Sequence, residues 1–190
     1  MELIPKILTG AHVRLEPLGE DHREGMRKAA NDPDTWKWMS LRGDGEHFNV
    51  WFDYLLADQA KGNAISHAVI VDEQIIGHSA YLVITPPFDR VEIGWTWYAK
   101  GHRGTRVNPE CKLLLLGHAF ACGAERVELK THHKNIHSQN AMAKMGAVRE
   151  GVLRHHVKMW DGSWRDSVYF SVLRDEWPTV KAGLETRLKA

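Results

Sequence analysis

Residues 90–109 join an apolar strand to a helix through a short basic loop that contains glycine. Asn108 can cap this helix, Pro109 suits its first position, and Glu110 lies where the helix dipole favours a carboxylate. The loop carries four basic side chains, Lys100, His102, Arg103 and Arg106. Because backbone N–H groups at a helix start are free to bind an anion, the segment predicts a phosphate or pyrophosphate site. A plain connection with solvated basic side chains is the alternative.

The periodicity of the flanking residues predicts one mixed sheet with helices packed against it. Strands are expected over 12–18, 66–71, 75–84, 90–99 and 126–131, followed by two strands joined by a two-residue turn at Asp161-Gly162. Helices are expected over 20–30, 46–61, 108–122 and 136–145, with a last helix at the C-terminus. A central strand–helix–strand crossover makes its two strands parallel or splayed, and a splay would leave a cleft. The expected fold is α/β (α+β), a twisted and mostly antiparallel sheet of about seven strands with flanking helices.

Composition limits the class of protein. The 190 residues carry a formal net charge of +1 and fit a single domain, 1–190, without linkers or repeats. This charge balance argues against a nucleic-acid coat, and the longest aliphatic run, Leu113–Leu116, is too short to cross a membrane. Cys111 and Cys122 give no disulfide framework, and the first residues do not resemble a signal peptide. A cytoplasmic location is therefore expected.

Several motifs follow one another along the second half of the chain: Glu92-Ile93-Gly94-Trp95, Arg103-Gly104-Thr105, the helix start Val107–Leu116, Asn135–Ala141 and Lys144–Ala147. With the pattern from Arg14 to Leu173, they resemble the GNAT acetyltransferase family, most closely its RimJ/RimL-like branch. The resemblance implies a GNAT-like fold and an acetyl-CoA-dependent N-acetyltransferase. In such enzymes the acetyl group passes directly to a primary amine, here a protein N-terminal α-amine or a small-molecule amine. A non-catalytic acyl-CoA-binding or sensing module is the alternative function.

The resemblance also implies where acetyl-CoA binds. Its pyrophosphate is expected on the amides of the 102–106 loop, and its pantetheine in the splay between two strands. The residues implied for the cofactor are Trp97, Tyr98, His102, Arg103, Gly104, Thr105, Arg106, Asn135 and Ser138. The loop departs from the family pattern, because Gly101 holds its first place and Arg106 its last. The Arg106 side chain either crowds the pyrophosphate or turns outward and adds a charge.

Glu92 is the expected proton acceptor for the amine, directly or through water, because it lies mid-strand beside the expected cleft. Strand alternation places four neighbours on the opposite face, namely Val91, Ile93, Trp95 and Trp97. A solvated carboxylate, or one paired with Arg90, is the alternative. One of His132 and His133 could assist the proton relay.

Ser138 is the expected proton donor to the leaving thiolate, since the resemblance implies a hydroxyl on the helix after Asn135 and that helix contains no Tyr. Asn135 is implied to contact the pantetheine. Both residues could instead only satisfy the free N–H groups of the helix start. Tyr98 is the second candidate for the donor, and a backbone N–H near Trp97 or Tyr98 would meet the developing oxyanion.

Aromatic side chains in or near connections are expected to line the acceptor pocket. The expected substrate residues are Trp36, Tyr81 and Trp160, with Trp38 beside them, whereas Trp51, Trp95 and Trp177 are expected in the core. No metal is expected despite 12 histidines, because no Cys or carboxylate completes a ligand set. The expected partners are acetyl-CoA and an amine acceptor, with no nucleic acid and no membrane, and the chain is compatible with a homodimer.

Overall fold

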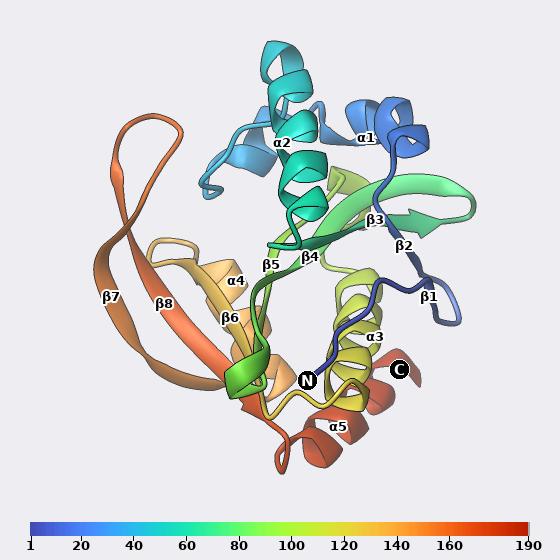
Figure 1. The fold of residues 1–190 in the computed structure, drawn as a ribbon, viewed down its shortest axis with the longest axis vertical. Helices are drawn as coiled ribbons and strands as arrows, with labels where there is room; N and C mark the ends of the chain where they lie inside the picture. Colours follow the sequence, from blue (N-terminus) through green and yellow to red (C-terminus); the bar gives the residue numbers. More distant parts are fainter. Residues whose placement is uncertain (190) are drawn as a thin grey trace.

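One twisted sheet of eight strands forms the centre of the computed structural model, which describes residues 1–189 (Figure 1). The strands are β1 (Leu8–Thr9), β2 (Arg14–Pro17), β3 (Ile65–Val71), β4 (Gln74–Thr85), β5 (Arg90–Tyr98), β6 (Arg126–His132), β7 (Val148–Lys158) and β8 (Trp164–Leu173). Their order is β1-β2-β3-β4-β5-β6-β8-β7, with β5 and β6 parallel and the other described pairs antiparallel. The predicted mixed, mostly antiparallel sheet is confirmed. It has one strand more than expected because the two-residue β1 pairs with β2.

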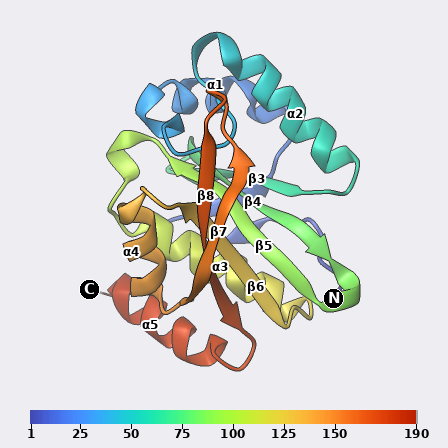
Figure 2. The ribbon, with the colours of Figure 1, turned by 90° about the vertical axis from the view of Figure 1, so that its left-hand side faces the viewer.

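Helices cover both faces of this sheet (Figure 2). They are α1 (Arg23–Ala30), α2 (Phe48–Ala60), α3 (Val107–Ala121), α4 (Ile136–Met145) and α5 (Trp177–Lys189). Helices α1 and α2 lie on one side, and α3 and α5 lie on the other. Adjacent side chains of β3 point to opposite faces of the sheet: Ala68 packs in the hydrophobic cluster beneath α2, and Val69 packs in the cluster beneath α3.

Two hydrophobic cores hold the helices to the sheet. The larger core, on the side of α3 and α5, contains Leu15 and Leu115, which are both fully buried. The smaller core is aromatic, and the Trp36 ring lies 5.0 Å from the Trp51 ring and 5.5 Å from the Trp97 ring. Burying a large apolar side chain stabilises the fold by about 1.5–3 kcal/mol. The sheet between these cores is therefore a rigid support for the groups along its middle strands.

Strands β5 and β6 pair over a short stretch and then diverge. Their parallel register begins at Arg90 and Arg126 and ends where Glu92 meets Glu128. Beyond that point β5 continues beside β4 as far as Tyr98, and β6 continues beside β8. The predicted splay of the two strands is confirmed. Within the described sheet, the backbone groups that face the gap have no ladder partner across it.

A β-bulge in β5 lies just beyond the point where the strands part. Trp95 has a φ of 49°, and the pairing with β4 shifts register between Gly94 and Trp97. Ile93, before the bulge, packs in the larger core, whereas Trp97, beyond it, packs in the aromatic core on the other face. The strict alternation predicted for this strand is therefore wrong, because the extra residue turns the later side chains over.

The start of α3 also differs from the prediction. The helix begins at Val107, and Asn108 does not cap it, because its Oδ1 accepts a hydrogen bond from the Tyr98 hydroxyl at 3.2 Å. The Glu110 carboxylate turns toward the N-terminal hairpin and accepts a hydrogen bond from the His12 backbone N–H at 3.0 Å. Neither side chain caps the helix start, where the Val107 N–H donates to Thr105 Oγ1 at 3.3 Å and the Asn108 N–H has no partner within residues 1–189.

The connection between β7 and β8 is longer than the expected two-residue turn. It runs from Met159 to Ser163, and the Met159 N–H donates a hydrogen bond of 2.8 Å to the Ser163 carbonyl. Gly162 has a φ of 85°, a conformation that glycine adopts without strain. The hairpin extends beyond the rest of the sheet at its β7 edge (Figure 1).

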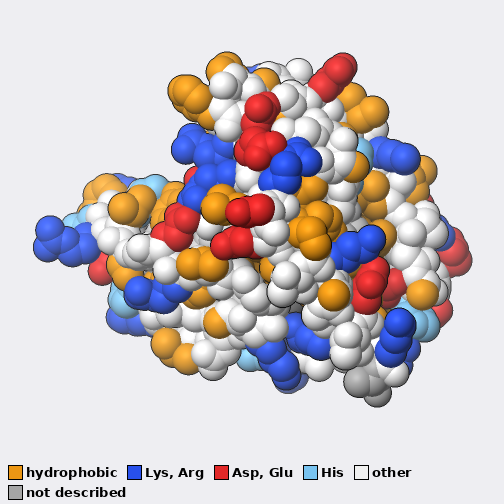
Figure 3. All heavy atoms as spheres, turned by 90° about the horizontal axis from the view of Figure 1, so that it is seen from below, with side chains coloured by type: hydrophobic (Ala, Val, Ile, Leu, Met, Phe, Trp, Pro, Cys, Tyr) orange, Lys and Arg blue, Asp and Glu red, His pale blue; other side chains and the backbone are white. Residues whose placement is uncertain are grey.

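Charges of both signs share the surface seen from below. On this face Lys and Arg side chains lie next to Asp and Glu side chains (Figure 3). This mixture agrees with the formal net charge of +1 for the whole chain. Among residues 1–189, no helix has both the length and the hydrophobicity to cross a bilayer.

Candidate active site

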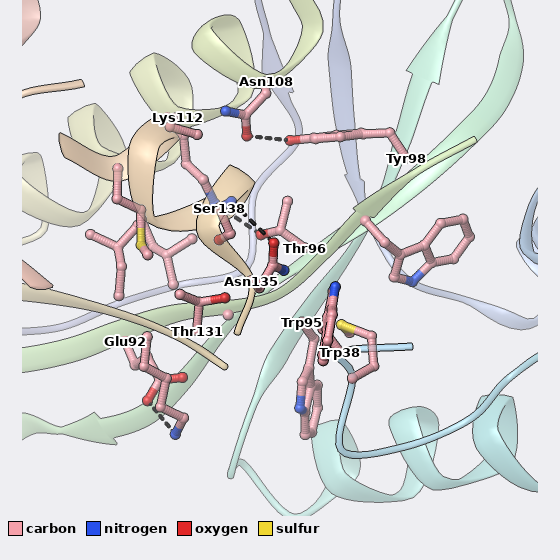
Figure 4. A pocket seen from close by; sticks show the side chains of 18 of the residues that line it. Trp38, Glu92, Trp95, Thr96, Tyr98, Asn108, Lys112, Thr131, Asn135 and Ser138 are labelled. Carbon is pink, nitrogen blue, oxygen red and sulfur yellow. Dashed lines mark hydrogen bonds and ion pairs between the residues drawn. The ribbon is translucent and has the colours of Figure 1, made fainter. Parts of the chain in front are cut away.

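A cavity of about 960 Å³ opens between the diverging ends of β5 and β6. One part, which we call the α3 half, is lined by Thr96, Tyr98, Asn108, Lys112, Asn135 and Ser138. The other part, the β8 half, is lined by Trp38, Leu82, Trp95, Lys130 and Arg165. Figure 4 shows Lys112 and Asn108 at one end of the cavity, Trp38 and Trp95 toward another, and Glu92 on its own strand. The splay of the sheet thus creates one continuous site with two differently built parts.

Glu92 lies where the two strands part and is only 1% exposed. Its Oε2 accepts a hydrogen bond of 2.7 Å from Lys130 Nζ, and no hydrogen bond from residues 1–189 reaches its Oε1. Burial raises the pKa of the Glu92 carboxyl above its ordinary value, although Lys130 opposes this shift. Arg90 approaches Glu128 instead, at 3.8 Å, so neither a solvated Glu92 nor a pair with Arg90 is present. A raised pKa suits a carboxylate that must accept a proton near neutral pH.

Lys112 is the residue of the α3 half that sequence reasoning missed. It is 6% exposed, and its Nζ donates a hydrogen bond of 2.9 Å to Thr96 Oγ1. No carboxylate in the described part of the chain lies within 4.0 Å of this ammonium. Burial lowers the pKa of Lys112 to about 8. The available signal was its spacing of three and four residues from the apolar Leu115 and Leu116, which marks the buried face of α3.

Asn135 and Ser138 meet at the start of α4 (Figure 4). Asn135 Oδ1 accepts a hydrogen bond of 3.1 Å from the Ser138 backbone N–H and so caps the helix. The Ser138 hydroxyl takes no part in that cap, and Ser138 lines the cavity. The interpretation as a helix-end group therefore applies to the Asn135 side chain and not to the Ser138 hydroxyl.

The basic side chains of the loop before α3 are turned away from the cavity or bound to the protein. Arg103 lines the cavity, but its guanidinium donates hydrogen bonds of 2.8 Å to the backbone carbonyl at the end of β5 and to the Asp32 carboxylate. Arg106 Nη1 lies 3.0 Å from His12 Nε2, so this side chain turns outward and does not crowd the loop. His102 and Arg106 are not part of the cavity lining. The expected cationic contacts from these two side chains are therefore not in place.

The backbone of the same loop does face the cavity. Gly104 and Thr105 both line it, and Gly104 has a φ of 74°. A Cβ added at Gly104 would meet no atom of the protein within 4 Å. A glycine in this conformation, next to the start of α3, presents backbone N–H groups to an incoming anion.

Trp97 and Tyr98 both line the cavity, as expected for residues whose backbone faces the cofactor, and their side chains are largely buried in the protein. The Trp97 indole belongs to the aromatic core and is 5% exposed. The Tyr98 hydroxyl donates to Asn108, and burial raises the pKa of Tyr98 well above its ordinary value. The Tyr98 proton is thus already engaged, whereas no hydrogen bond within residues 1–189 engages the Ser138 hydroxyl, which leaves Ser138 as the better placed of the two predicted donors.

The three residues predicted to contact the acceptor lie elsewhere. Trp36 is 0% exposed, and its indole N–H donates to the Ala30 carbonyl at 3.0 Å. Tyr81 is equally buried, and its hydroxyl donates to the Leu115 carbonyl at 2.6 Å. Trp160 lies on the β7–β8 hairpin, outside the cavity lining, and its indole N–H donates to the Trp36 carbonyl at 3.2 Å. These predictions are corrected, because an aromatic residue near a connection can be a core residue as readily as a pocket residue.

Trp38 and Trp95 line the β8 half in their place. Trp38 was expected near the acceptor, and its ring packs 4.8 Å from that of His132. Trp95 was expected in the core; it packs against the core as a partly buried side chain and also lines the cavity. Trp51 and Trp177 pack in or against the hydrophobic cores as expected.

His132 and His133, the two histidines considered for the proton relay, lie side by side at the end of β6. His132 and His133 stack with ring centroids 4.5 Å apart. Burial, followed by the influence of His133, lowers the pKa of His132 to about 4, so it is a poor proton acceptor near neutral pH. Across residues 1–189, no three His, Cys, Asp or Glu side chains come together as metal ligands would.

Comparisons with known proteins agree with this architecture. The family model of the acetyltransferase (GNAT) domain matches residues 12–148. A presumed acetyltransferase from T. thermophilus has 36% sequence identity and a TM-score of 0.90, covering 99% of this chain and 100% of its own. A GCN5-related N-acetyltransferase from Brucella melitensis has 27% identity and a TM-score of 0.88, covering 97% of this chain and 86% of its own. No curated protein sequence matches the chain.

The chain therefore belongs to the GNAT acetyltransferase family and is an N-acetyltransferase of that type. The predicted family resemblance is confirmed. Mycobacterium smegmatis RimJ, solved in complex with CoA-disulfide, has the same fold with a TM-score of 0.80 at 19% identity, covering 96% of this chain and 94% of its own. At that identity the likeness concerns the fold alone.

Proposed function

We propose that this N-acetyltransferase uses acetyl-CoA and moves the acetyl group directly to a primary amine. The observation that carries the proposal is the cavity between β5 and β6, which connects the start of α3 with a buried carboxylate. The first feature suits the pyrophosphate of a coenzyme, and the second suits a proton acceptor for an amine.

The α3 half fits acetyl-CoA in three ways. The Gly104 loop and the start of α3 offer free backbone N–H groups, and the unpaired edge of β5 beyond Glu92 can hydrogen-bond the amides of the pantetheine. The Lys112 ammonium has spare hydrogen-bond donors beside this path. The RimJ structure with CoA-disulfide supports the same class of ligand. When bound, acetyl-CoA supplies the acetyl group as a thioester.

Glu92 would take the proton of the amine. A lysine ammonium has a reference pKa near 10.4 and an α-ammonium near 8, so an α-amine needs less help to become a nucleophile. The free Oε1 of Glu92 can accept that proton directly or through water, while Lys130 holds Oε2. The Ser138 hydroxyl, at the start of α4, would donate a proton to the departing thiolate.

A module that binds acyl-CoA without catalysis is the alternative. Such a module would not need a carboxylate buried beside the cofactor site, and burial of an unneeded charge carries a free-energy penalty. The position of Glu92 therefore favours an enzyme. Thiol release from acetyl-CoA, measured with a mixed panel of peptides and small amines, tests this directly. Amine-dependent release supports the proposal, whereas binding of acetyl-CoA without release by any amine would support the module.

The role of Glu92 is tested by Glu92→Gln. Turnover at neutral pH should fall, and raising the pH should restore much of it, because the amine then loses its proton to solvent. Glu46→Gln is the control for loss of a carboxylate, since Glu46 is exposed and lies outside the cavity lining. A pH profile of Glu92→Gln that runs parallel to that of the wild type would exclude Glu92 as the base.

A further inference from the structure

Arg165, on β8, lines the β8 half of the cavity and is only 7% exposed. Its Nε donates a hydrogen bond of 3.0 Å to Ser167 Oγ, and its Nη1 lies 3.5 Å from the Trp38 carbonyl oxygen. Among residues 1–189, no acceptor reaches Nη2 and no carboxylate lies within 4.0 Å of the guanidinium. A buried guanidinium therefore faces the cavity with unused hydrogen-bond donors.

The other arginines of the described chain differ from Arg165. Eight of them have a carboxylate partner: Arg14, Arg23, Arg27, Arg42, Arg90, Arg103, Arg126 and Arg174. The remaining four are half-buried or exposed, namely Arg106, Arg149, Arg154 and Arg187. Burying a guanidinium without a counter-charge is unfavourable, and an anionic ligand would offset that penalty. The β8 half is thus built for a ligand with an anionic group.

Arg165 and Glu92 act on each other across this half of the cavity. The charge of Arg165 lowers the pKa of Glu92, and the charge of Glu92 raises that of Arg165, in each case against the larger effect of burial. The two side chains nevertheless form no ion pair, because Lys130 holds Glu92 at 2.7 Å. The site therefore presents a proton acceptor and a free cation to one and the same ligand.

We infer that the acceptor amine belongs to a free α-amino acid, whose carboxylate pairs with Arg165 while its amino group faces Glu92; this rests on the proposed function. A planar guanidinium binds a carboxylate through two parallel hydrogen bonds, which fixes the orientation of the small molecule. Trp38, Trp95 and Leu82 supply apolar walls for its side chain. In the reaction, a bond forms between the amine nitrogen and the acetyl carbon, and the carbon–sulfur bond breaks. The amine gives its proton to Glu92, and the sulfur leaves with the electron pair and is protonated.

A matched set of acceptors tests this assignment by thiol release from acetyl-CoA. The set contains α-amino acids, the corresponding amino acid amides, the corresponding decarboxylated amines, and tripeptides with the same first residue. The amide amine is less basic than that of the free acid, so amine basicity alone favours the amides. For the wild type we expect kcat/KM for the acids to exceed that for the amides by about tenfold or more, as a lost charged pair predicts.

Arg165→Gln should abolish this preference. Loss of the Arg165 charge also raises the pKa of Glu92, but this effect acts on acids and amides alike and cancels in the ratio of their kcat/KM values. The ratio is measured within one protein preparation, so a partly unfolded variant still gives a valid result. Arg154→Gln is the control, because Arg154 is an exposed arginine of the neighbouring β7 without a carboxylate partner. Arg165→Lys, which keeps the charge but loses the planar fork, should retain part of the preference.

The outcomes separate this inference from the proposed function. Turnover of amides, amines or tripeptides without any preference for free acids would overturn the inference and leave the acetyltransferase intact. A preference for free acids that survives in Arg165→Gln would overturn the assignment of Arg165. If no acceptor causes thiol release, both the inference and the proposed function are overturned.

Discussion

His78 donates a hydrogen bond from Nδ1 to the backbone carbonyl of Trp95, at 2.9 Å, within the bulge that follows the point where β5 and β6 part. His78 is 0% exposed, and burial lowers its pKa to about 4, so the ring is neutral near pH 7. The carbonyl accepts, so Nδ1 carries the proton. This bond holds the strained residue whose side chain enters the cavity, and it connects a buried residue of β4 to the shape of the site.

His78→Ala should therefore weaken both the fold and the site. The substitution leaves a carbonyl without a donor and a void in the aromatic core, which together lower the free energy of unfolding by about 2–4 kcal/mol. His78→Asn can place its amide nitrogen near the position of Nδ1 and should recover part of the loss. Chemical denaturation and calorimetric titration with CoA measure the two effects. Equal CoA affinity in the alanine variant and the wild type would show that the bulge does not depend on this bond.

The conformation of Gly104 yields a second prediction, which concerns the cofactor. Gly104→Asp would place a carboxylate where the loop amides face the cavity, and acetyl-CoA affinity should fall by about tenfold or more, equivalent to about 1.4 kcal/mol. Gly104→Ala is the control, since it shares the strain of a φ of 74° but adds no charge. Calorimetry should therefore show a much larger loss for the aspartate variant. Similar affinities in the two variants would exclude a phosphate at this loop.

The order of elements could be predicted from the sequence, because periodicity and turn residues report local structure. The crossover between 90–99 and 126–131 predicted strands that are parallel or splayed, and the structure shows a short parallel stretch followed by a splay. The 102–106 loop was predicted to bind a phosphate from its residue types and its place next to a helix start, and its backbone does face the cavity at Gly104 and Thr105. In each case the cause lies within a few residues of the effect.

The bulge and its consequences could not be predicted in this way. A single residue with positive φ, Trp95, reverses the face of the sheet to which the later side chains of β5 point. No local sequence pattern marks a tryptophan for that conformation. The same limit applies to Trp36 and Tyr81, whose burial depends on helices distant in sequence. Lys112 and Arg165 were missed because charged residues are expected at the surface, and only tertiary packing buries them.

Ser138 provides a third prediction, which the structure makes sharper. Since the helix cap uses only its backbone N–H, Ser138→Ala should leave the unfolding free energy unchanged and lower kcat by a factor of about 10² or more, with little change in the acetyl-CoA KM. Asn135→Ala, by contrast, removes the cap and should destabilise the protein by about 1 kcal/mol. Thermal unfolding and steady-state kinetics on both variants distinguish the two roles. Unchanged turnover in Ser138→Ala would show that water or another group, and not Ser138, donates the proton.

Lys112 leads to a fourth prediction, on stability. Its pKa is lowered by burial to about 8 from an ordinary value of 10.5, so the folded state releases this proton more readily than the unfolded state. The charged form therefore destabilises the fold at pH 7, and this penalty disappears as the pH rises from 8 to 10.5. Lys112→Met should raise the unfolding free energy at pH 7 by up to about 3 kcal/mol, with the gain lost at high pH, while CoA affinity falls. Denaturation at several pH values would refute this account if the variant gained nothing at pH 7.

Lys130 supplies the last prediction, which concerns the pH dependence of activity. Burial raises the pKa of Glu92, and Lys130 opposes that shift through its charge and its hydrogen bond of 2.7 Å. Removing the ammonium in Lys130→Met therefore raises the pKa of Glu92 further, so that more of the carboxyl is protonated at a given pH. A protonated Glu92 cannot accept the amine proton, and the acidic limb of the kcat/KM profile should move to higher pH, with a severalfold loss at neutral pH. Lys130→Arg keeps the positive charge and should keep the limb near its original position. If the acidic limb of the kcat/KM profile stays at the same pH in Lys130→Met, the limb reports the titration of a group other than Glu92.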